Sequence, residues 1–283
     1  MRSVKIGFIG QGFIGKNYAD DFENRGYSVT RYSLEEKHLP NKDSIKLCDI
    51  VFIAVPTPTT PEGYVCDIVE ESLYLVGDQK IAVIKSTMLP GTTTRLQEKF
   101  KNIYVLHSPE FLREVSAAYD AANPEKNIIG IPKDDPVIQE KANLVLSVLP
   151  KAKYSKICLS HEAELVKYAT NNFLYTKVIY MNMIYDLAEK LGCEWNTIVD
   201  SLVADARIGA SHMHPLHGTG RGAAGHCFIK DFAAFRDFYQ KTLPEHDDTI
   251  DVLISLENKN KNLLRSTGKD LHLFTGVYGP LDL

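Results

Sequence analysis

The sequence predicts an α/β fold: a parallel sheet covered by helices, followed by an all-helical domain with a long central helix. Up to about residue 158, short runs rich in valine and isoleucine alternate with helical stretches, as in a sheet with helices on both faces. From Glu162 to Leu191 the chain has no glycine or proline and places apolar side chains at helical spacing. We therefore predict two domains, residues 1–159 and residues 160–283.

The individual elements follow from the same patterns. Six apolar runs are predicted strands: Val4–Ile9, Tyr27–Tyr32, Ile50–Val55, Ile81–Lys85, Ile103–Leu106 and Ile128–Ile129. The predicted helices are Lys16–Asn24, Ile68–Val76 capped by Asp67, Pro136–Val148 capped by Asp135, Glu162–Leu191, Trp195–Leu202, a helix from Asp231, and Thr249–Leu264. Gly192 ends the long helix, and Gly209–Gly225 is a predicted loop.

Composition excludes several classes of protein. The 283 residues are 44% apolar with a formal net charge of −4, which is ordinary for a globular chain and gives no attraction to nucleic acid or an anionic membrane. No apolar run approaches the roughly 20 residues that span a bilayer. Five scattered cysteines without a CxxC pair are typical of a reduced, cytoplasmic protein and leave room for one reactive thiol: Cys48, Cys66, Cys158, Cys193 and Cys227.

A Gly-x-Gly-x-x-Gly segment, Gly10–Gly15, follows the first predicted strand and opens a helix. In that context the glycines allow a tight turn, a close approach of a pyrophosphate and close packing of helix on strand. It predicts a Rossmann-type domain that binds NAD or NADP. Ser33 stands where an acid binds the ribose of NAD, and Arg31 could serve a 2′-phosphate, so both cofactors remain open; Glu35 or Glu36 could bind the ribose instead.

One cysteine lies in a setting that suits a nucleophile. Cys227 follows a glycine-rich loop and precedes a helix that Asp231 could cap, with Lys230 beside it. A helix N-terminus and a neighbouring cation lower the pKa of a thiol. A buried structural cysteine is the alternative interpretation of this pattern.

Seven motifs together resemble the UDP-glucose/GDP-mannose dehydrogenase family, in the family's order from residue 4 to about residue 235. They are Gly10–Gly15; Val51–Thr59; Lys85-Ser86-Thr87 with Pro90-Gly91; Ser108–Glu114; Glu164, Lys167-Tyr168 and Asn171; Arg207-Ile208-Gly209; and Cys227 with Lys230-Asp231. The family oxidises the C6 alcohol of a nucleotide sugar to a carboxylate with two NAD. The resemblance implies this activity, with UDP-glucose as the first candidate substrate.

The resemblance also implies roles for individual residues. Cys227 captures the aldehyde as a thiohemiacetal that becomes a thioester, Lys167 and Asn171 hold the C6 oxygen, and Asp231 assists proton transfer with an ordered water. Glu114 is a candidate for thioester hydrolysis, and Thr87 is similar to a water-binding threonine.

Binding residues are implied in the same way. The cofactor would be contacted by Gly10, Gly12, Phe13, Ile14, Gly15, Ser33, Val55, Pro56, Thr57, Thr87, Glu114 and Lys230. The substrate would be contacted by Glu110, Phe111, Leu112, Arg113, Glu114, Lys167, Asn171, Arg207, Gly222 and Ala224. In the family, the residue that Arg207 matches reaches the substrate across a dimer interface, so we expect a homodimer centred on the long helix.

The sequence departs from the family's pattern at several points. Ala224 replaces a glycine, which would be costly if the position requires a positive φ. Four histidines crowd the same loop without a recognised metal motif, and we predict no metal: His212, His214, His217 and His226. After the helix Thr249–Leu264 only a short segment follows, in which Lys269–Gly276 resembles the first strand of a further nucleotide-binding domain. The base of the nucleotide could therefore be bound by a partner chain in trans.

Two alternatives remain open. One is a two-domain, one-step hydroxy-acid dehydrogenase of the 6-phosphogluconate or 3-hydroxyisobutyrate type, which uses a lysine and an asparagine four residues apart, as in Lys167 and Asn171, and needs no cysteine. The other is a catalytically degenerate protein that binds a dinucleotide or nucleotide sugar, suggested by Ser33, Ala224 and the short C-terminal segment.

Overall fold

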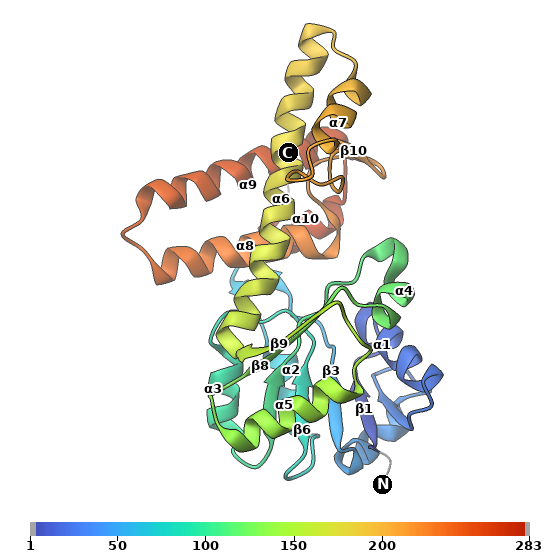
Figure 1. Ribbon diagram of the computed structural model, residues 1–283. Coiled ribbons are helices and arrows are strands. Elements are labelled where there is room, and N and C mark those ends of the chain that lie inside the picture. The colour runs from blue at the N-terminus through green and yellow to red at the C-terminus, as the bar shows by residue number, and fades with distance from the viewer. Residues whose placement is uncertain (1–3, 281–283) are drawn as a thin grey trace. The chain divides into compact units, whose positions relative to one another are not determined.

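The computed structural model describes residues 4–280 and divides the chain into two compact units (Figure 1). The first unit comprises the described residues up to Thr57 together with Val65–Lys167, and the second comprises Pro58–Tyr64 and the described residues from Tyr168 onward. Among residues 4–280, no helix is long and apolar enough to cross a membrane.

The first unit is built on one sheet with the strand order β2-β1-β3-β6-β7-β8-β9. Its strands are β1 (Ile6–Ile9), β2 (Val29–Tyr32), β3 (Ile50–Ile53), β6 (Ile81–Ile84), β7 (Tyr104–His107), β8 (Lys126–Ile131) and β9 (Tyr154–Leu159). Neighbouring strands are parallel except β7 and β8, which meet antiparallel at His107 and Gly130. The predicted sheet is confirmed, with this one reversal and with β9 as an additional strand at its edge.

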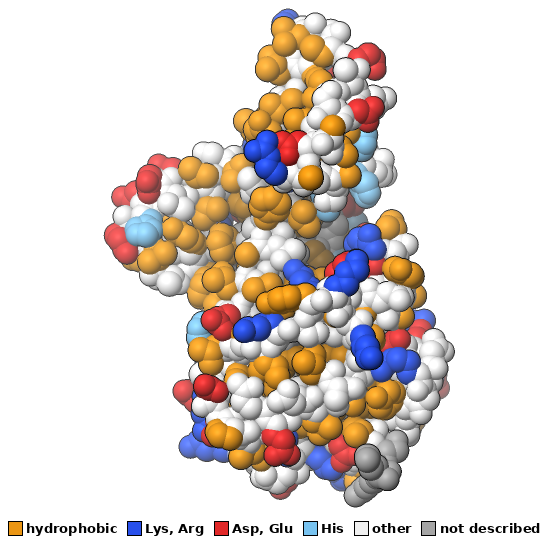
Figure 2. Space-filling model, in the orientation of Figure 1, with side chains coloured by type: hydrophobic (Ala, Val, Ile, Leu, Met, Phe, Trp, Pro, Cys, Tyr) orange, Lys and Arg blue, Asp and Glu red, His pale blue; other side chains and the backbone are white. Residues whose placement is uncertain are grey.

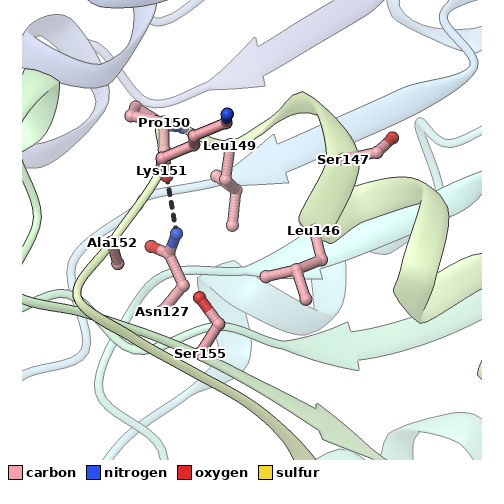
Figure 3. Close-up of a pocket in the computed structure, with 8 residues that line it drawn as sticks. All are labelled: Asn127, Leu146, Ser147, Leu149, Pro150, Lys151, Ala152 and Ser155. Atoms are coloured by element: carbon pink, nitrogen blue, oxygen red, sulfur yellow. Dashed lines mark hydrogen bonds between the residues drawn. The ribbon is translucent and has the colours of Figure 1, made fainter.

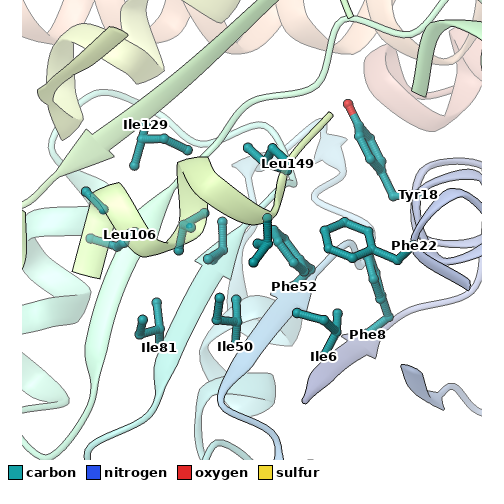
Figure 4. Close-up of a cluster of buried hydrophobic side chains, with 14 of the residues drawn as sticks. Ile6, Phe8, Tyr18, Phe22, Ile50, Phe52, Ile81, Leu106, Ile129 and Leu149 are labelled. Atoms are coloured by element: carbon teal, nitrogen blue, oxygen red, sulfur yellow. The ribbon is translucent and has the colours of Figure 1, made fainter. Parts of the chain in front are cut away.

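Alternate residues of the strands face opposite sides of the sheet. One side carries Ile6, Phe8 and Phe52, which pack with α1 (Phe13–Asn24), α4 (Ala117–Ala122) and α5 (Pro136–Val148), as Figure 4 shows in part. The other side carries Ile9, Val51, Ile53, Ala82 and Ile84, which pack with the 3₁₀ segment Leu39–Leu47, α2 (Asp67–Leu73) and α3 (Thr92–Lys99). Helices therefore cover both faces, as the alternating pattern predicted.

Helix starts were predicted with mixed success. Asp135 caps α5 as expected, because its carboxylate accepts hydrogen bonds from the N–H groups of Val137 (3.0 Å) and Ile138 (3.3 Å). The prediction for Asp67 was wrong: Cys66 is the N-cap of α2, and Asp67 lies in the first turn.

The second unit is mainly helical. It holds all but the first two turns of α6 (Ser160–Leu191), followed by α7 (Trp195–Val203), α8 (Gly225–Thr242), α9 (Asp247–Thr267) and α10 (Leu271–Tyr278). Two small hairpins complete it, β4 (Thr59–Thr60) with β5 (Gly63–Tyr64), and β10 (Leu216–His217) with β11 (Gly220–Arg221). The rings of Tyr175 and Phe232 stack in its core at 3.9 Å between centroids.

Two expectations for this unit were wrong. The helix expected from Asp231 begins six residues earlier, at Gly225, so Asp231 lies inside α8 and does not cap it. The segment Lys269–Gly276, expected to be a strand, contributes to helix α10 instead. Its apolar residues Phe274 and Val277 are buried against Ile229 and Ala233 of α8, and this tertiary packing overrides the local strand-like pattern.

A shallow pocket of about 320 Å³ lies in the first unit between the end of α5 and strands β8 and β9 (Figure 3). Its polar side chains are largely used within the fold: the Asn127 amide donates to Pro150 O (2.7 Å), and the Ser147 hydroxyl donates to Leu144 O (2.7 Å). It contains no cluster of ionisable groups, so we assign it no chemical role.

Candidate active site

The glycines after β1 differ in what surrounds them. Gly10 has φ +89°, and a Cβ atom there would lie 2.4 Å from the Ala54 carbonyl oxygen. A Cβ at Gly15 would lie 1.9 Å from the Gly10 carbonyl oxygen, whereas a Cβ at Gly12 would meet nothing within 4 Å. Gly10 and Gly15 are therefore required by the turn and by packing, while Gly12 faces open space.

The start of α1 suits the pyrophosphate of a dinucleotide. Gly12 is the N-cap and offers no side chain to the first turn, which begins with Phe13 and Ile14. The N–H groups of a helix's first turn have no partners within the helix and attract an anion. An open glycine beside such N–H groups is what the close approach of a pyrophosphate requires.

The end of β2 bears on the choice of cofactor. The Ser33 hydroxyl lies 3.1 Å from Nδ1 of His38. Arg31 forms ion pairs with Asp20 and Glu23 of α1, each at 2.7 Å. Its guanidinium is thus already bound to two carboxylates of the same domain.

The loop after β3 and the end of β6 are joined by a hydrogen bond. The Ser86 hydroxyl donates to Val55 O at 2.6 Å. Thr57 and Thr87, which the sequence assigned to cofactor and water binding, are buried, and Pro56 is exposed.

Lys167 and Glu110 form a buried ion pair. The Lys167 ammonium donates to Glu110 Oε1 and to the Glu110 carbonyl oxygen, both at 2.8 Å. Both side chains are at most 5% exposed. This pair excludes a solvated position for Lys167 on the surface of the helix. The two residues are 57 positions apart, so no local signal could have paired them.

A second lysine is buried nearby. The Lys85 ammonium lies 3.2 Å from Ser108 Oγ and 4.3 Å from the centre of the Tyr18 ring. Burial lowers the pKa of Lys85 to about 7; the charge of Lys167 acts in the same direction, while Glu110 opposes it. No local pattern predicted that Lys85 would be buried, because a charged residue at the end of a strand is ordinarily exposed.

The segment Phe111–Glu114 leads from this buried pair to the surface. The centre of the Phe111 ring lies 3.8 Å from the Lys126 ammonium and 5.5 Å from the Lys167 ammonium. The Leu112 N–H donates to Glu110 Oε2 at 2.8 Å. The predicted substrate segment therefore begins in contact with the Lys167–Glu110 pair.

Arg113 and Glu114 are exposed. Arg113 forms an ion pair with Asp120 at 2.5 Å, which lowers the pKa of Asp120 to about 2. Glu114 begins the 3₁₀ segment Glu114–Ser116. The described first unit does not bring Glu114 into the buried cluster around Lys167.

Glu164 has a clear structural task in the first unit. Its carboxylate accepts hydrogen bonds from the N–H groups of Gly91 (2.6 Å) and Thr93 (2.8 Å) and from the Thr93 hydroxyl (2.6 Å). It thereby caps α3 from the first turns of α6. Burial raises the pKa of Glu164 to about 7, although these hydrogen bonds lower it. The sequence placed Glu164 in a motif but did not predict this capping role.

The second unit brings Asn171, Lys230 and Asp231 together. The Asp231 carboxylate is buried and accepts hydrogen bonds from the Asn171 amide (2.6 Å) and the Lys230 ammonium (2.5 Å). Cys227 is exposed, occupies the third position of α8 and lies one turn before Asp231. Asn171 follows Lys167 by one turn on the continuous helix α6.

A pocket of about 200 Å³ opens at the start of α8, within the second unit. Its lining includes Pro58, Thr59, His226, Lys230 and His272. The Thr59 hydroxyl donates to Lys230 O at 3.0 Å, which fixes the loop after Pro58 against α8. The pocket is thus lined by Lys230, which was predicted to contact the cofactor, and by Pro58 and Thr59, which directly follow the predicted cofactor contacts Val55, Pro56 and Thr57.

The loop before Cys227 shows that an alanine at position 224 is not costly. Ala224 has φ −135°, an extended conformation open to any residue, so its Cβ introduces no backbone strain. The positive φ values fall on Gly222 (+95°) and Gly225 (+76°). A Cβ at Gly222 would also lie 2.8 Å from Asn260 Oδ1, which explains the need for glycine there.

Arg207 and the four histidines remain without an assigned ligand. Arg207 is exposed and pairs with Asp205 at 2.5 Å. His212 has φ +62° and lies 5.7 Å from the Phe228 ring, and burial lowers its pKa. Within residues 4–280, no three His, Cys, Asp or Glu side chains are grouped so that they could hold a metal ion.

Two parts of the chain match known protein families. Residues 34–145 match the NAD binding domain of the UDP-glucose/GDP-mannose dehydrogenase family, and residues 161–262 match the central domain of that family. A UDP-glucose 6-dehydrogenase from Rhizobium meliloti is 30% identical over 81% of this chain and 53% of that protein. The chain spans about half the length of the curated relatives it matches.

Solved dehydrogenase structures share the fold of this chain. A UDP-glucose dehydrogenase from the hyperthermophilic archaeon Pyrobaculum islandicum has a TM-score of 0.77 and 26% identity, covering 91% of this chain and 68% of that one. A 3-hydroxyisobutyrate dehydrogenase from Mycobacterium tuberculosis has a TM-score of 0.69, covers 92% of this chain and 96% of that one, and at 17% identity shares the fold alone.

Proposed function

The chain belongs to the UDP-glucose/GDP-mannose dehydrogenase family, and on that premise we propose that it is a nucleotide-sugar 6-dehydrogenase. The proposed reaction oxidises the C6 alcohol of a UDP-sugar, with UDP-glucose as the first candidate, to the carboxylate in two NAD-dependent steps through Cys227. The observation that carries the proposal is the arrangement on α8, where an exposed cysteine lies one turn before a buried aspartate held by Asn171 and Lys230.

The N-terminal domain fits NAD on its own geometry. Gly12 leaves open space at the uncapped start of α1, where a pyrophosphate would be held by the N–H groups of the first turn. Bound NAD would supply the hydride acceptor for both oxidations. The ion pairs of Arg31 with Asp20 and Glu23 favour NAD over NADP, because a 2′-phosphate would have to compete with two carboxylates.

Cys227 would make the overall reaction a four-electron oxidation without release of the aldehyde. Its thiolate adds to the aldehyde carbon, and the carbonyl oxygen takes up a proton to give a thiohemiacetal. Oxidation of that adduct leaves a thioester. Water then attacks the thioester carbon, the C–S bond breaks, and the acid and the free thiol are formed.

The C6 oxygen and its proton transfers would be assisted by Lys167, Asn171 and Asp231. An ammonium and an amide one turn apart can both donate to a C6 alkoxide or to the tetrahedral oxyanion. The Lys167 ammonium is already oriented by Glu110, and the Asn171 amide by Asp231. Each donor is thus held by a carboxylate before any substrate binds, which lowers the cost of reorganisation in the transition state.

We also propose that the chain forms a homodimer through α6. Five large apolar side chains on this helix are between 49% and 69% exposed: Phe173, Tyr180, Met183, Leu187 and Leu191. Their successive spacings of seven, three, four and four residues place them on one side of the helix. Figure 2 shows hydrophobic side chains gathered over the upper stretch of this helix. Exposed apolar stripes of this kind mark interfaces.

A one-step hydroxy-acid dehydrogenase is the second candidate function. It is supported by the fold shared with the Mycobacterium tuberculosis 3-hydroxyisobutyrate dehydrogenase, and by the lysine and asparagine one turn apart on α6. That reaction needs no thiol, so Cys227 separates the two candidates.

The decisive experiment is a stoichiometry measurement with UDP- and GDP-sugars and NAD. We expect two NADH for each sugar acid formed. Cys227→Ser is expected to stop acid formation, whereas Cys193→Ser, which changes another exposed cysteine, leaves it intact. Oxidation of hydroxy acids in place of nucleotide sugars, with one NADH per substrate and no effect of Cys227→Ser, would establish the second candidate. Tight binding of a nucleotide sugar without any turnover would identify a degenerate binding protein.

A further inference from the structure

The segment that leads to Cys227 is held by side chains from a single distant region. Five hydrogen bonds from four side chains bind the backbone of Arg221–Gly225 to α9 and to the turn after it. They are Arg221 N–H to Thr267 Oγ1 (3.1 Å), Lys269 Nζ to Gly222 O (3.1 Å), the Asn260 amide to both N–H and C=O of Ala223 (2.8 Å each), and Gly225 N–H to Asp270 Oδ2 (2.9 Å). These side chains bind the loop backbone as a neighbouring strand would.

The contact is close as well as polar. A Cβ at Gly220 would lie 2.4 Å from Thr267 Oγ1, and a Cβ at Gly222 would lie 2.8 Å from Asn260 Oδ1. Asn260 is 1% exposed and Lys269 is 6% exposed. A buried polar network in which every member is bonded favours a single backbone arrangement.

The last of these contacts, made by Asp270, reaches Gly225, which is the first residue of α8, the helix that carries Cys227. The N-cap residue of α8 is Ala224, which has no side-chain acceptor for the N–H groups of the first turn. Asp270 supplies a carboxylate for the Gly225 N–H from another element. Asp270 itself has φ +48°, a conformation costly for a residue other than glycine, and such strain persists where the surrounding contacts enforce it.

We propose that Asn260, Thr267, Lys269 and Asp270 form a clamp of positioning residues that fixes where α8 begins and so where the Cys227 thiol is presented. None of the four touches the reacting atoms in this role; they act through the backbone of Arg221–Gly225. The assignment of Cys227 as nucleophile rests on the proposed function, whereas the clamp itself rests on the contacts above.

The test compares Asp270→Ala with Asp270→Asn, which keeps an acceptor oxygen but removes the charge. The first readout is amide hydrogen exchange at Gly225, and the second is kcat for acid formation against KM for sugar and NAD. Loss of a charge-assisted hydrogen bond predicts about tenfold faster exchange and about tenfold lower kcat in Asp270→Ala, with both KM values within about twofold. Asp270→Asn is expected to restore both values to within about threefold of the parent protein.

Tyr278→Phe is the matched control, because it removes the hydrogen bond from α10 to Glu257 and leaves the clamp intact. If Asp270→Ala does not fold, Thr267→Val, an isosteric change, should accelerate exchange at Arg221 instead. Unchanged exchange at Gly225 in a folded Asp270→Ala, or faster exchange with kcat unaltered, would overturn the proposal. Absence of turnover in the parent protein would refute the proposed function, and the exchange rates would still decide whether the clamp exists.

Discussion

The two carboxylate oxygens of Glu110 bind different partners: Oε1 accepts a hydrogen bond from the Lys167 ammonium of α6, and Oε2 accepts one from the N–H of Leu112. This one carboxylate therefore positions both Lys167, which is proposed to hold the C6 oxygen, and the start of the proposed substrate segment.

Removal of this carboxylate should be costly. Glu110→Gln leaves the Lys167 ammonium buried without its counter-charge, and loss of one partner of a buried pair destabilises a protein by about 3–5 kcal/mol. The free energy of unfolding in urea measures the loss. Glu125→Gln, which breaks the pair of Glu125 with Lys153, is the control, because that pair is at least 76% exposed and worth about 1 kcal/mol or less. Equal losses in the two variants would contradict the buried pair.

Lys85 should make stability depend on pH. Its pKa is about 7 in the folded protein and 10.5 in the unfolded chain, so between these values the unfolded chain binds more protons and the folded protein gains stability as pH rises. Relative to Lys85→Met, the parent protein should gain roughly 1.4 kcal/mol per pH unit in this window and no more above or below it.

The measurement is the free energy of unfolding of both proteins between pH 6 and pH 11. Ser108→Ala removes the hydrogen-bond acceptor of Lys85 but keeps the titratable lysine itself. This variant should therefore retain the dependence of stability on pH. A constant difference between the parent protein and Lys85→Met over the whole range would show that Lys85 is not held in a low-pKa setting.

Two glycines of the dinucleotide turn should respond in opposite ways to alanine. Gly15→Ala forces a Cβ to 1.9 Å from the Gly10 carbonyl oxygen and should cost on the order of 1–3 kcal/mol of stability or more. Gly12→Ala meets no protein atom and should leave stability within about 0.5 kcal/mol. It should weaken NAD binding about tenfold in calorimetry, because the methyl group occupies the approach of the pyrophosphate. Unaltered NAD affinity in Gly12→Ala would place the pyrophosphate elsewhere.

The exposed apolar side of α6 should control association. Phe173→Glu combined with Leu187→Glu places two charges in the proposed interface and should convert the dimer to a monomer in sedimentation velocity. Glu189→Lys changes a charge on the opposite side of the helix and should leave the dimer intact. A parent protein that sediments as a monomer would refute the proposed homodimer.

Local sequence patterns predicted the elements whose stability is local. The buried strands of the sheet, the capped helix α5 and the long α6 all follow from periodicity and capping. Strand β9 was missed because its first three residues are exposed and it lacks an apolar run. Helix α10 was expected to be a strand because Leu271, Leu273 and Phe274 read as an apolar run, and only packing on α8 makes them helical.

In the site, too, local sequence predicted some features and missed those that depend on distant contacts. Cys227, Lys167 and Asp231 could be singled out by residue type and motif, but their partners could not. Glu110 is 57 residues from Lys167, and Asp231 is 60 residues from Asn171. Asp231 was expected to cap a helix, since an acid before an apolar stretch commonly does; in the folded protein Asp270 caps that helix from a different element.

The ion pairs of Arg31 have a consequence for engineering cofactor use. An arginine at the end of the second strand is commonly regarded as the determinant of NADP binding, yet here its charge is offset by Asp20 and Glu23. A variant that prefers NADP would therefore be sought first at these two acids of α1, by Asp20→Asn and Glu23→Gln. Arg31, which could then bind the extra phosphate, is already in the chain, and Asp20 and Glu23 keep its guanidinium occupied.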